Sequence, residues 1–472
     1  MDFHDEFFNQ RLSRNIFSSY YKDFLKFLYK ALLFSRLPLL RRNKTFILHI
    51  QFRLANFLDG CFAAIKEGKV EAKKLKVKIG EETNKDAKSE LIEALDGIQT
   101  RFFAHKNLAR IAKYIADGIA WRKLNYDRSV IRLLSSNRRT VSINVNEPGF
   151  KGVLNVARGL TAQHRSCVII NDLTNFIRIG DLTEIYKKSV YIHECKQKGK
   201  RIRNIFTLLH DIKKVNNIGR QSDQLLTAQT AITHRVIIVN SKQTVRIKEI
   251  DIPFHDFLKD IKRVISKANK NGYSSKLISS YLSVSCLNLK ELIQQKKVEE
   301  WKKFQRADNW DDKDFVVPFT NTDTFYKNED FFIPNWTPYS IFPFSAKMCL
   351  GLLSGNLILT ALLNLSNLYE YFRENGWEVE GLSEGQFIRR YDPGLPLVPN
   401  METAYQYDET LCVLKRGAFH LAIPATWIFR IGMDFVSPKT ILLEAEKIFH
   451  EAVPPQSDMV AINITREKKV WK

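Results

Sequence analysis

Apolar residues recur three and four positions apart through the first third of the chain. A clear run is Ile111, Ile115 and Ile119, where an apolar side chain returns at each helical turn. Helices that bury one face show this spacing, which can be followed from about residue 7 to residue 134. We therefore expect residues 1–148 to form a helical N-terminal region.

Two stretches inside this region depart from the amphipathic pattern. Residues 66–88 are highly charged and poor in aromatic residues, which favours either an exposed linker between helices or a hairpin. Residues 117–128 are dense in Trp, Tyr, Arg and Asp. That composition suits a buried polar network or a surface facing an active site, and a structural use is our expectation.

The pattern changes after the Pro-Gly break near residue 149. Apolar positions between residues 153 and 160 predict one more short helix. Residues 168–170 and 235–239 are apolar runs of the kind that strands buried on both faces show. With a hairpin between them, these elements predict a separate core at residues 149–252.

The hairpin is the most informative part of this core. Residues 179–186 and 189–196 alternate in polarity on either side of two lysines, which predicts two antiparallel strands. Alternation places Glu194 and Lys196 on one face of the second strand. If the strands pair across the two-lysine break, Asp181 of the first strand ends near Glu194.

Two carboxylates and a lysine at this spacing have a chemical meaning. Asp181 and Glu194 on one sheet face would raise the pKa of each other unless a cation lies between them. Oxygen ligands without Cys or a His pair favour magnesium or manganese over zinc. Metal-assisted phosphodiester cleavage needs such ligands, with an ammonium to steady the phosphate or the attacking water. A solvated sheet face with a cross-strand ion pair is the alternative.

Asp181, twelve intervening residues and then Glu194-Cys195-Lys196 resemble the signature of the PD-(D/E)xK nuclease superfamily, with Gly180 where that signature has Pro. Residues 170–181 also resemble larger bacterial proteins that carry this core. The resemblance implies an α/β (α+β) fold, with a restriction-endonuclease-like mixed sheet flanked by helices, an α-β-β-β-α-β order and magnesium dependence. It implies that Asp181 and Glu194 bind the metal and that Lys196 is catalytic.

Other members of the superfamily place Gln or Arg on the helix after the lysine strand. Arg220, Gln221 and Gln224 match that position, and the two glutamines lie three apart on one helical face. An ordinary polar helix surface is the alternative. Some members add an acid from an earlier helix, for which Asp117 and Asp127 are candidates that no spacing separates.

Residues 253–472 complete the chain as a helical and mixed α/β region for which the sequence indicates no function. No internal repeat is visible in it. We expect helices at residues 254–304 and 348–365, an irregular aromatic segment at 310–338, and strands at 410–414 and 459–464.

Charge points to a polyanionic partner. The 472 residues carry a formal net charge of +22, which favours nucleic acid, although charge alone does not separate DNA, RNA and an anionic membrane. Basic residues gather right after the hairpin, where we expect phosphate contacts from a group of four: Lys198, Lys200, Arg201 and Arg203. A solvated basic loop is the alternative.

Other features narrow the class of protein. Six cysteines without a Cys-x-x-Cys pair and an acidic N-terminus favour a reduced, cytoplasmic protein without a signal peptide or a membrane span. Neither a phosphate-binding Gly-x4-Gly-Lys loop nor the motifs of metalloproteases and serine hydrolases occur. Arg101 and His105 are one position short of the spacing sought for a helical ribonuclease.

The sequence therefore predicts a magnesium-dependent (or manganese-dependent) endonuclease that acts on DNA, with a role in bacterial defence by analogy. Two alternatives stay open: a nucleic-acid-binding or scaffold protein with an inactive nuclease-like core, and a nuclease directed at RNA. Assembly with a second copy or with a partner protein is left open too.

Overall fold

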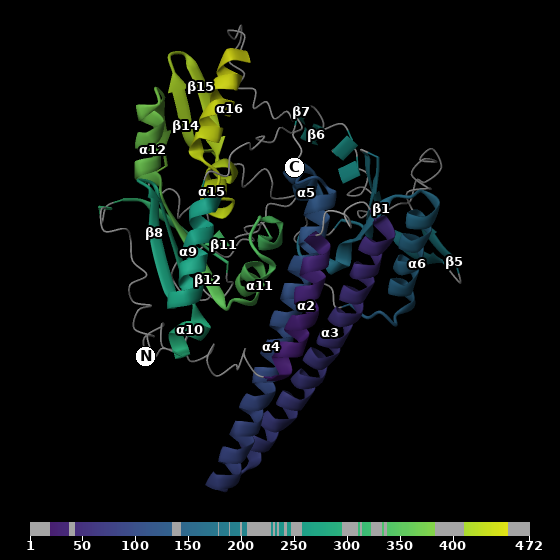
Figure 1. Ribbon diagram of the computed structural model, residues 1–472. Helices are drawn as coiled ribbons and strands as arrows, with labels where there is room; N and C mark the ends of the chain where they lie inside the picture. The colour runs from purple at the N-terminus through teal and green to yellow at the C-terminus, as the bar shows by residue number, and fades with distance from the viewer. Residues whose placement is uncertain are drawn as a thin grey trace. The chain divides into compact units, whose positions relative to one another are not determined.

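The computed structural model has a mixed α+β fold, with long N-terminal helices followed by several small, mostly antiparallel sheets (Figure 1). It describes residues 19–36, 43–134, 143–177, 179–187, 189–198, 201–204, 228–229, 232–233, 236–239, 243–246, 257–294, 310–311, 314–321, 333–334, 338–382 and 410–451.

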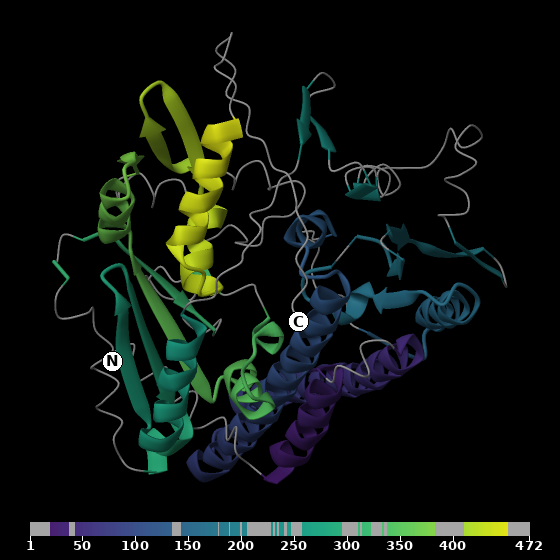
Figure 2. The ribbon, with the colours of Figure 1, turned by 45° about the horizontal axis from the view of Figure 1, so that its top comes forward.

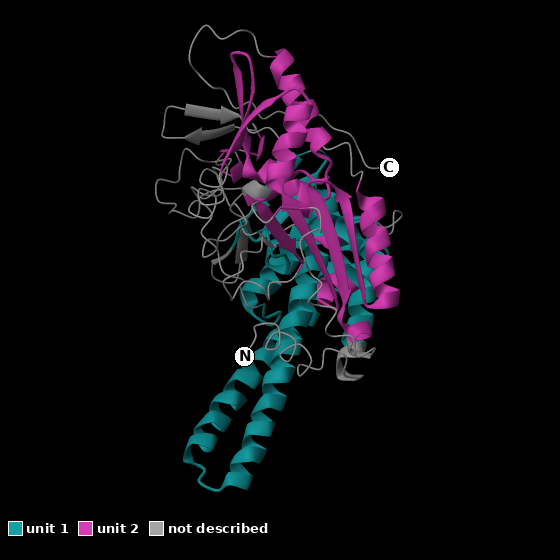
Figure 3. Ribbon diagram, turned by 90° about the vertical axis from the view of Figure 1, so that its left-hand side faces the viewer, with its two compact units in different colours: residues 1–124, 138–221, 340–350 teal, residues 125–137, 222–339, 351–472 magenta. Residues whose placement is uncertain are grey.

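The chain divides into two compact units (Figure 3). Unit 1 holds residues 1–124, 138–221 and 340–350. Unit 2 holds residues 125–137, 222–339 and 351–472. The N-terminal helices therefore share unit 1 with residues 149–221 of the predicted core. None of the described helices is both long and apolar enough to span a membrane.

Three helices open unit 1: α2 (Ser19–Arg36), α3 (Lys44–Glu81) and α4 (Lys85–Lys123). Asn43 and Asn84 cap α3 and α4, because each side chain accepts a hydrogen bond from a backbone N–H of the first turn. Residues 66–88 are therefore no linker, because they form most of the tip of an α3–α4 helical hairpin. Lys, Glu, Ala and Leu are strong helix formers, which explains how so charged a stretch stays helical.

The exposed interior of α4 offers a test of this helix. A Cβ added at Gly97 would meet no atom within 4 Å, and Ala is about 1 kcal/mol more favourable than Gly inside a helix. We expect Gly97→Ala to raise the melting temperature measured by circular dichroism. Gly118→Ala is expected to lower the melting temperature, because its added Cβ would collide with the Ser340 side chain. Equal melting temperatures for the two variants would contradict the packing described for α4.

A small antiparallel sheet follows α6 (Pro148–Gln163), in the order β1-β2-β3. Its strands are β1 (Cys167–Ile170), β2 (Leu182–Tyr186) and β3 (Ser189–His193), with a 3-10 turn, η2 (Asn171–Leu173), after β1. All four residues of β1 are buried, and α3 and α6 pack against this strand. The helix and the first strand predicted here are confirmed, and so is a hairpin across the two lysines. Its strands are shorter than predicted, because the first begins at Leu182 and the second ends at His193. Glu194 and Lys196 therefore do not share a face of that second strand, and Lys196 belongs to a separate sheet.

Two further hairpins follow in the chain. β4 (Cys195–Lys198) pairs with β5 (Arg201–Asn204), and β6 (Val236–Val239) pairs with β7 (Gln243–Arg246), both antiparallel. The strand predicted at residues 235–239 is therefore confirmed in position.

Unit 2 is built on a five-stranded sheet in the order β11-β10-β12-β9-β8, against which α9 (Leu258–Asn271) packs (Figure 2). Only the β10–β11 pair of this sheet is parallel. The strands are β8 (Tyr273–Ser279), β9 (Leu282–Asn288), β10 (Val316–Thr320), β11 (Ile333–Pro334) and β12 (Leu357–Asn364).

Two long helices predicted in this region are wrong. The helix expected at residues 254–304 stops at Gly272, whose φ of 85° is left-handed, and the chain continues as the β8–β9 hairpin. The helix expected at 348–365 likewise breaks at Gly355 (φ 72°) into α11 (Ala346–Ser354) and β12. Strands β9 and β12 are neighbours inside the sheet and nearly every residue in them is buried, so neither shows the polar alternation of a half-exposed strand.

The remaining elements of the chain include a three-stranded antiparallel sheet, β13-β14-β15, which confirms the strand predicted at 410–414. The strand predicted at 459–464 lies outside the described residues, and the segment 310–338, expected to be irregular, contains β10. The elements are α5 (Arg128–Leu134), α10 (Leu289–Gln294), η6 (Tyr339–Ile341), α12 (Leu365–Glu374), β13 (Glu378–Gly381), β14 (Thr410–Arg416), β15 (Phe419–Pro424), α15 (Ala425–Met433) and α16 (Pro438–Glu451).

Candidate active site

Asp181 and Glu194 lie next to the last ladder pair of the β2–β3 hairpin, at the end away from its turn. The ladder pairs Leu182 with His193, and the Asp181 N–H donates to the His193 carbonyl at 2.8 Å. Continued by one residue, this register would set Asp181 opposite Glu194, but the Asp181 N–H bonds to His193 and not to Glu194, so the regular ladder ends at Leu182 and His193. Asp181 itself precedes β2 in a bend, so the prediction that the first strand begins at residue 179 and includes Asp181 is wrong.

The Asp181 carboxylate is held against the start of β4. Its Oδ2 accepts a hydrogen bond of 2.5 Å from the backbone N–H of Cys195, the residue after Glu194. Glu194 is buried, with 5% of its surface exposed. Burial, followed by the charges of Asp181 and Glu194, raises the pKa of the Cys195 thiol to about 12. Both carboxylates therefore act on one side chain, which places two negative charges around residue 195.

This pair has the donor chemistry of a hard-cation site. Carboxylate oxygens are preferred by magnesium, which usually keeps several waters and takes only one or two carboxylates from the protein. Over the described part of the chain, His, Cys, Asp and Glu side chains form no group of three or more that could hold a metal ion. A cation at Asp181 and Glu194 would therefore have no third His, Cys, Asp or Glu ligand among the described residues.

A buried asparagine determines where Asp181 lies. Asn171 Nδ2 donates to the carbonyls of Ile179 (2.9 Å) and Gly180 (3.1 Å), and its Oδ1 accepts from Thr183 Oγ1 (2.9 Å). The Asn171 backbone N–H also donates to the Asp181 carbonyl at 3.0 Å. Gly180 has a φ of 72°, which favours glycine at the position where the superfamily signature has Pro.

The N-terminal helices hold the other side of this turn. Gln51 of α3 donates to the Val168 carbonyl (2.8 Å) and accepts from the Ile170 N–H (2.9 Å), so its amide pairs with β1 as a strand would. The buried Lys113 of α4 donates to the Asp172 carbonyl at 3.1 Å. These contacts tie the predicted helical region and the predicted core together, and the sequence pattern held no sign of them.

The two upstream acids have structural partners. Asp117, 1% exposed, accepts hydrogen bonds from the Asn175 N–H (2.8 Å), the Asn175 side-chain amide (2.8 Å) and the Phe176 N–H (3.4 Å). It therefore caps the loop that leads to Asp181, which confirms the structural use expected of residues 117–128. Asp127, in unit 2, accepts from the Val130 N–H (3.3 Å) in the first turn of α5.

The basic residues near the pair are described only in part. The β4–β5 ladder sets Lys196 opposite Arg203 and Lys198 opposite Arg201, and only the backbone of these four is described. Their predicted contacts with phosphate, and the catalytic role of Lys196, stay predictions. The other predicted site residues lie outside the described residues: Lys200, Arg220, Gln221 and Gln224.

A buried acid that sequence reasoning missed lies on β2. Glu184, 4% exposed, accepts hydrogen bonds from His193 Nε2 (2.9 Å) and His164 Nδ1 (3.2 Å). Burial alone would raise the pKa of Glu184, but hydrogen bonds from His193, Ser166 and His164 outweigh it, so the pKa lies below its ordinary value of 4.5. Only the pairing of β2 with β3 brings Glu184 and His193 together, so the linear spacing carried no signal.

A depressed pKa makes the contribution of Glu184 to stability depend on pH. The contribution is complete above pH 4.5 and is lost as the pH falls through the lower pKa of the folded state. We expect Glu184→Gln to lower the free energy of unfolding at pH 7 by about 1–3 kcal/mol, since hydrogen bonds to a buried charge are lost. Urea unfolding between pH 7 and pH 3 should show this difference shrinking below pH 4.5. A difference that stayed constant with pH would contradict the prediction, and the exposed Glu93→Gln is the control.

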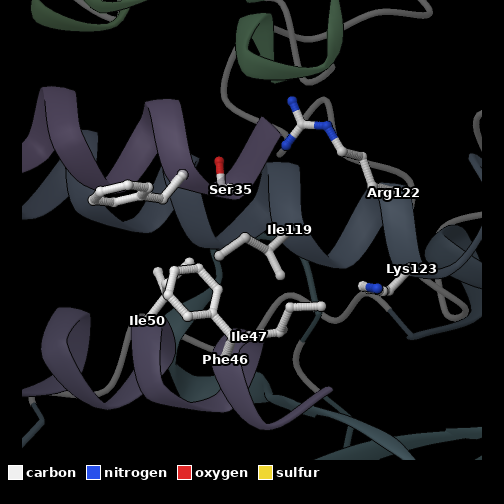
Figure 4. A pocket seen from close by; sticks show the side chains of 8 residues that line it. Ser35, Phe46, Ile47, Ile50, Ile119, Arg122 and Lys123 are labelled. Carbon is white, nitrogen blue, oxygen red and sulfur yellow. The ribbon is translucent and has the colours of Figure 1, made fainter. Parts of the chain in front are cut away.

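Two other features of unit 1 are explained by packing. His105, one of the two residues considered for a helical ribonuclease, is buried with its ring 5.9 Å from that of Phe24, and burial followed by the charge of Arg101 lowers its pKa. A cavity between α2, α3 and α4 has a volume of only about 10 Å³, room for one water molecule (Figure 4). Its lining, which includes Ile50 and Ile119, is mostly apolar.

The function of this chain is inferred from its own residues. Comparisons with models of known protein families, with characterised proteins and with solved structures found no match to the chain.

Proposed function

We propose that this chain is a metal-dependent phosphodiesterase, an endonuclease that acts on DNA. The observation that supports the proposal is the position of Asp181 and Glu194 at one end of the β2–β3 hairpin, where the N–H of Cys195, the residue after Glu194, donates to the Asp181 carboxylate at 2.5 Å. Two carboxylate charges held close together repel each other, and a divalent cation bound between them would offset that repulsion. Such a pair is a common feature of metal sites that act on phosphate.

Three residues have roles in this proposal. Asp181 and Glu194 would hold magnesium or manganese through their carboxylate oxygens, with the Cys195 N–H fixing the orientation of Asp181. A bound cation of this kind acidifies water and polarises a phosphoryl oxygen. Lys196, two residues beyond Glu194, would orient the attacking water or stabilise the charge that develops on the phosphate.

The fold supports part of the resemblance to the PD-(D/E)xK superfamily. The order α6, β1, β2, β3 agrees with the first half of the core that the resemblance implies. The described ladders between residues 167 and 246 are all antiparallel, which departs from the mixed sheet of that core. Asp181 and Glu194 do not depend on a parallel strand for their positions, because they border the two strands of one antiparallel hairpin.

Charge supports a nucleic acid as the substrate. The β4–β5 ladder sets four basic residues at directly opposite positions, two pairs of like charge beside Glu194. Like charges at opposed positions of a ladder repel each other. The phosphates of a nucleic acid would offset this repulsion, in keeping with the net charge of +22.

The direct test is cleavage by the purified full-length chain. Supercoiled plasmid and a labelled RNA are incubated separately with magnesium, with manganese and with EDTA. We expect nicked and linear plasmid with either metal, no product with EDTA, and slower cleavage of RNA. Faster cleavage of RNA would support the RNA-directed alternative. Binding without metal-dependent cleavage of either substrate would overturn the proposal and favour a nucleic-acid-binding protein with an inactive core.

A further inference from the structure

The outer half of the α3–α4 hairpin, which extends away from the rest of unit 1 (Figure 3), carries a groove of about 460 Å³. This volume lies in the range of ligand sites, about 300–1,000 Å³. The lining residues come from both helices: Gly68, Lys69, Ala72, Lys73 and Lys76 from α3, and Ile98, Gln99, Phe102 and Phe103 from α4.

Small residues open this groove. Gly68 and Ala72 lie one helical turn apart, where the seam between the helices would otherwise hold larger apolar side chains. A Cβ at Gly68 would be 3.7 Å from Phe102 Cβ and 3.9 Å from Ile98 Cγ2, so the position has room for ordinary contact. The floor of the groove is therefore apolar and partly aromatic.

The rim of the groove is cationic. Lys69, Lys73 and Lys76 are exposed and spaced i, i+4 and i+7, so they form one row that spans about 10 Å along α3. Glu67 and Glu71 are offset from this row by about half a turn and fall on the other side of the helix. Three positive charges thus line the apolar floor with no acid in their row.

Cations also lie over the aromatic floor. The ammonium of Lys106 is 4.5 Å from the centre of the Phe102 ring and 5.4 Å from that of Phe103, and Lys69 is 5.9 Å from the Phe102 ring. Both rings are partly exposed. Lysines beside accessible aromatic rings are the combination that binds phosphate and stacks unpaired bases.

We propose that this groove binds a single nucleic-acid strand, with the three lysines of α3 on its phosphates and Phe102 and Phe103 against its bases. A single strand is favoured over a duplex because only an unpaired base exposes a face to a phenyl ring. The inference rests on the proposed function and deepens it, because it names the form of nucleic acid that the chain holds outside the carboxylate pair.

The test measures binding without cleavage. Fluorescence anisotropy follows a labelled 20-nucleotide oligothymidylate titrated with the full-length chain in EDTA, at several salt concentrations. The groove variant is Lys73→Gln with Lys76→Gln, and the control is Lys74→Gln with Lys78→Gln. The control removes the same charge from the same helix, on the side away from the groove.

We expect the groove variant to weaken binding about tenfold and to lower the slope of log affinity against log salt by about 1.4, since each phosphate contact on a single strand contributes about 0.7. The control should change affinity less than twofold. Phe102→Ala should weaken binding at least about fivefold with little change in slope, because stacking is not ionic.

Several results would overturn the inference. Equal losses in the two lysine variants would show a diffuse effect of charge, and no loss in either would place the strand elsewhere. Tighter binding of a duplex, or binding of phosphatidylserine vesicles in place of the oligonucleotide, would name another partner. Plasmid cleavage separates the two proposals: cleavage with no effect of the groove variant leaves the nuclease standing, and a groove effect without cleavage leaves the groove standing.

Discussion

Replacement of Glu194 by Gln is expected to lower the rate of metal-dependent plasmid cleavage by at least about a thousandfold, the equivalent of about 4 kcal/mol in the barrier. Gln has nearly the size of Glu but is neutral, so it removes one of the two charges that would hold the cation. The loss should be largest at low magnesium and the magnesium concentration for half-maximal cleavage should rise, because the amide oxygen is a much weaker ligand. Initial rates of plasmid nicking, with the concentration of magnesium varied, would measure it.

The fold should survive this substitution. Glu194 is buried, and Gln keeps nearly its size and a side-chain carbonyl oxygen, so the variant should stay folded, which circular dichroism would check. Asp181→Asn is the companion variant, because its amide oxygen can still accept from the Cys195 N–H. The exposed Glu93→Gln is the control. Cleavage by Glu194→Gln at the wild-type rate, in a folded protein, would exclude the carboxylate pair as the site.

Asp117→Ala is expected to cost about 3 kcal/mol of stability, because it removes a buried charge that accepts three hydrogen bonds and leaves two backbone N–H groups without that acceptor. The loop from Asn175 leads directly to Asp181, so cleavage should slow as well. The magnesium concentration for half-maximal cleavage should not change, since Asp117 is assigned to the loop and not to the cation. Urea unfolding and a magnesium titration measure the two effects.

Asp96→Ala, on the exposed face of the same helix, is the matched control and should change stability by less than about 0.5 kcal/mol. Two outcomes would contradict the assignment of Asp117. A much higher magnesium requirement with unchanged stability would make it a ligand of the cation. Unchanged stability with unchanged cleavage would mean that the contacts of Asp117 with the loop contribute neither to stability nor to cleavage.

Local patterns predicted the elements that carry the candidate site. The α6 helix, β1 and the β2–β3 hairpin follow from apolar spacing over short stretches, and each was predicted in position, although both hairpin strands are three residues shorter than predicted. Prediction was wrong where a segment is buried on every side. Strands β9 and β12 have neighbours on both edges and are buried on both faces, so their residues show no alternation that distinguishes a strand from a buried helix.

The contacts around the site show the other limit of prediction. Gln51 pairs with β1 across 117 residues, and Asp117 caps the loop at Asn175 across 58 residues. Glu184 meets His193 only because β2 and β3 pair. Polar residues of this kind look like surface residues in the sequence, since a buried partner that satisfies them has no fixed spacing.

Sequence alone was enough to predict the pairing of β2 with β3 across the two lysines, because a two-residue turn leaves adjacent strands one register in which their apolar faces agree. The tertiary structure alone decided what surrounds Asp181 and Glu194: Asn171 holding the bend before β2, Asp117 holding the loop, and Glu184 engaged by two histidines. The two kinds of contact differ in how far apart the contacting residues lie in the sequence. A hairpin register is set within about twenty residues, whereas these partners meet only when α3, α4 and the small sheet pack together.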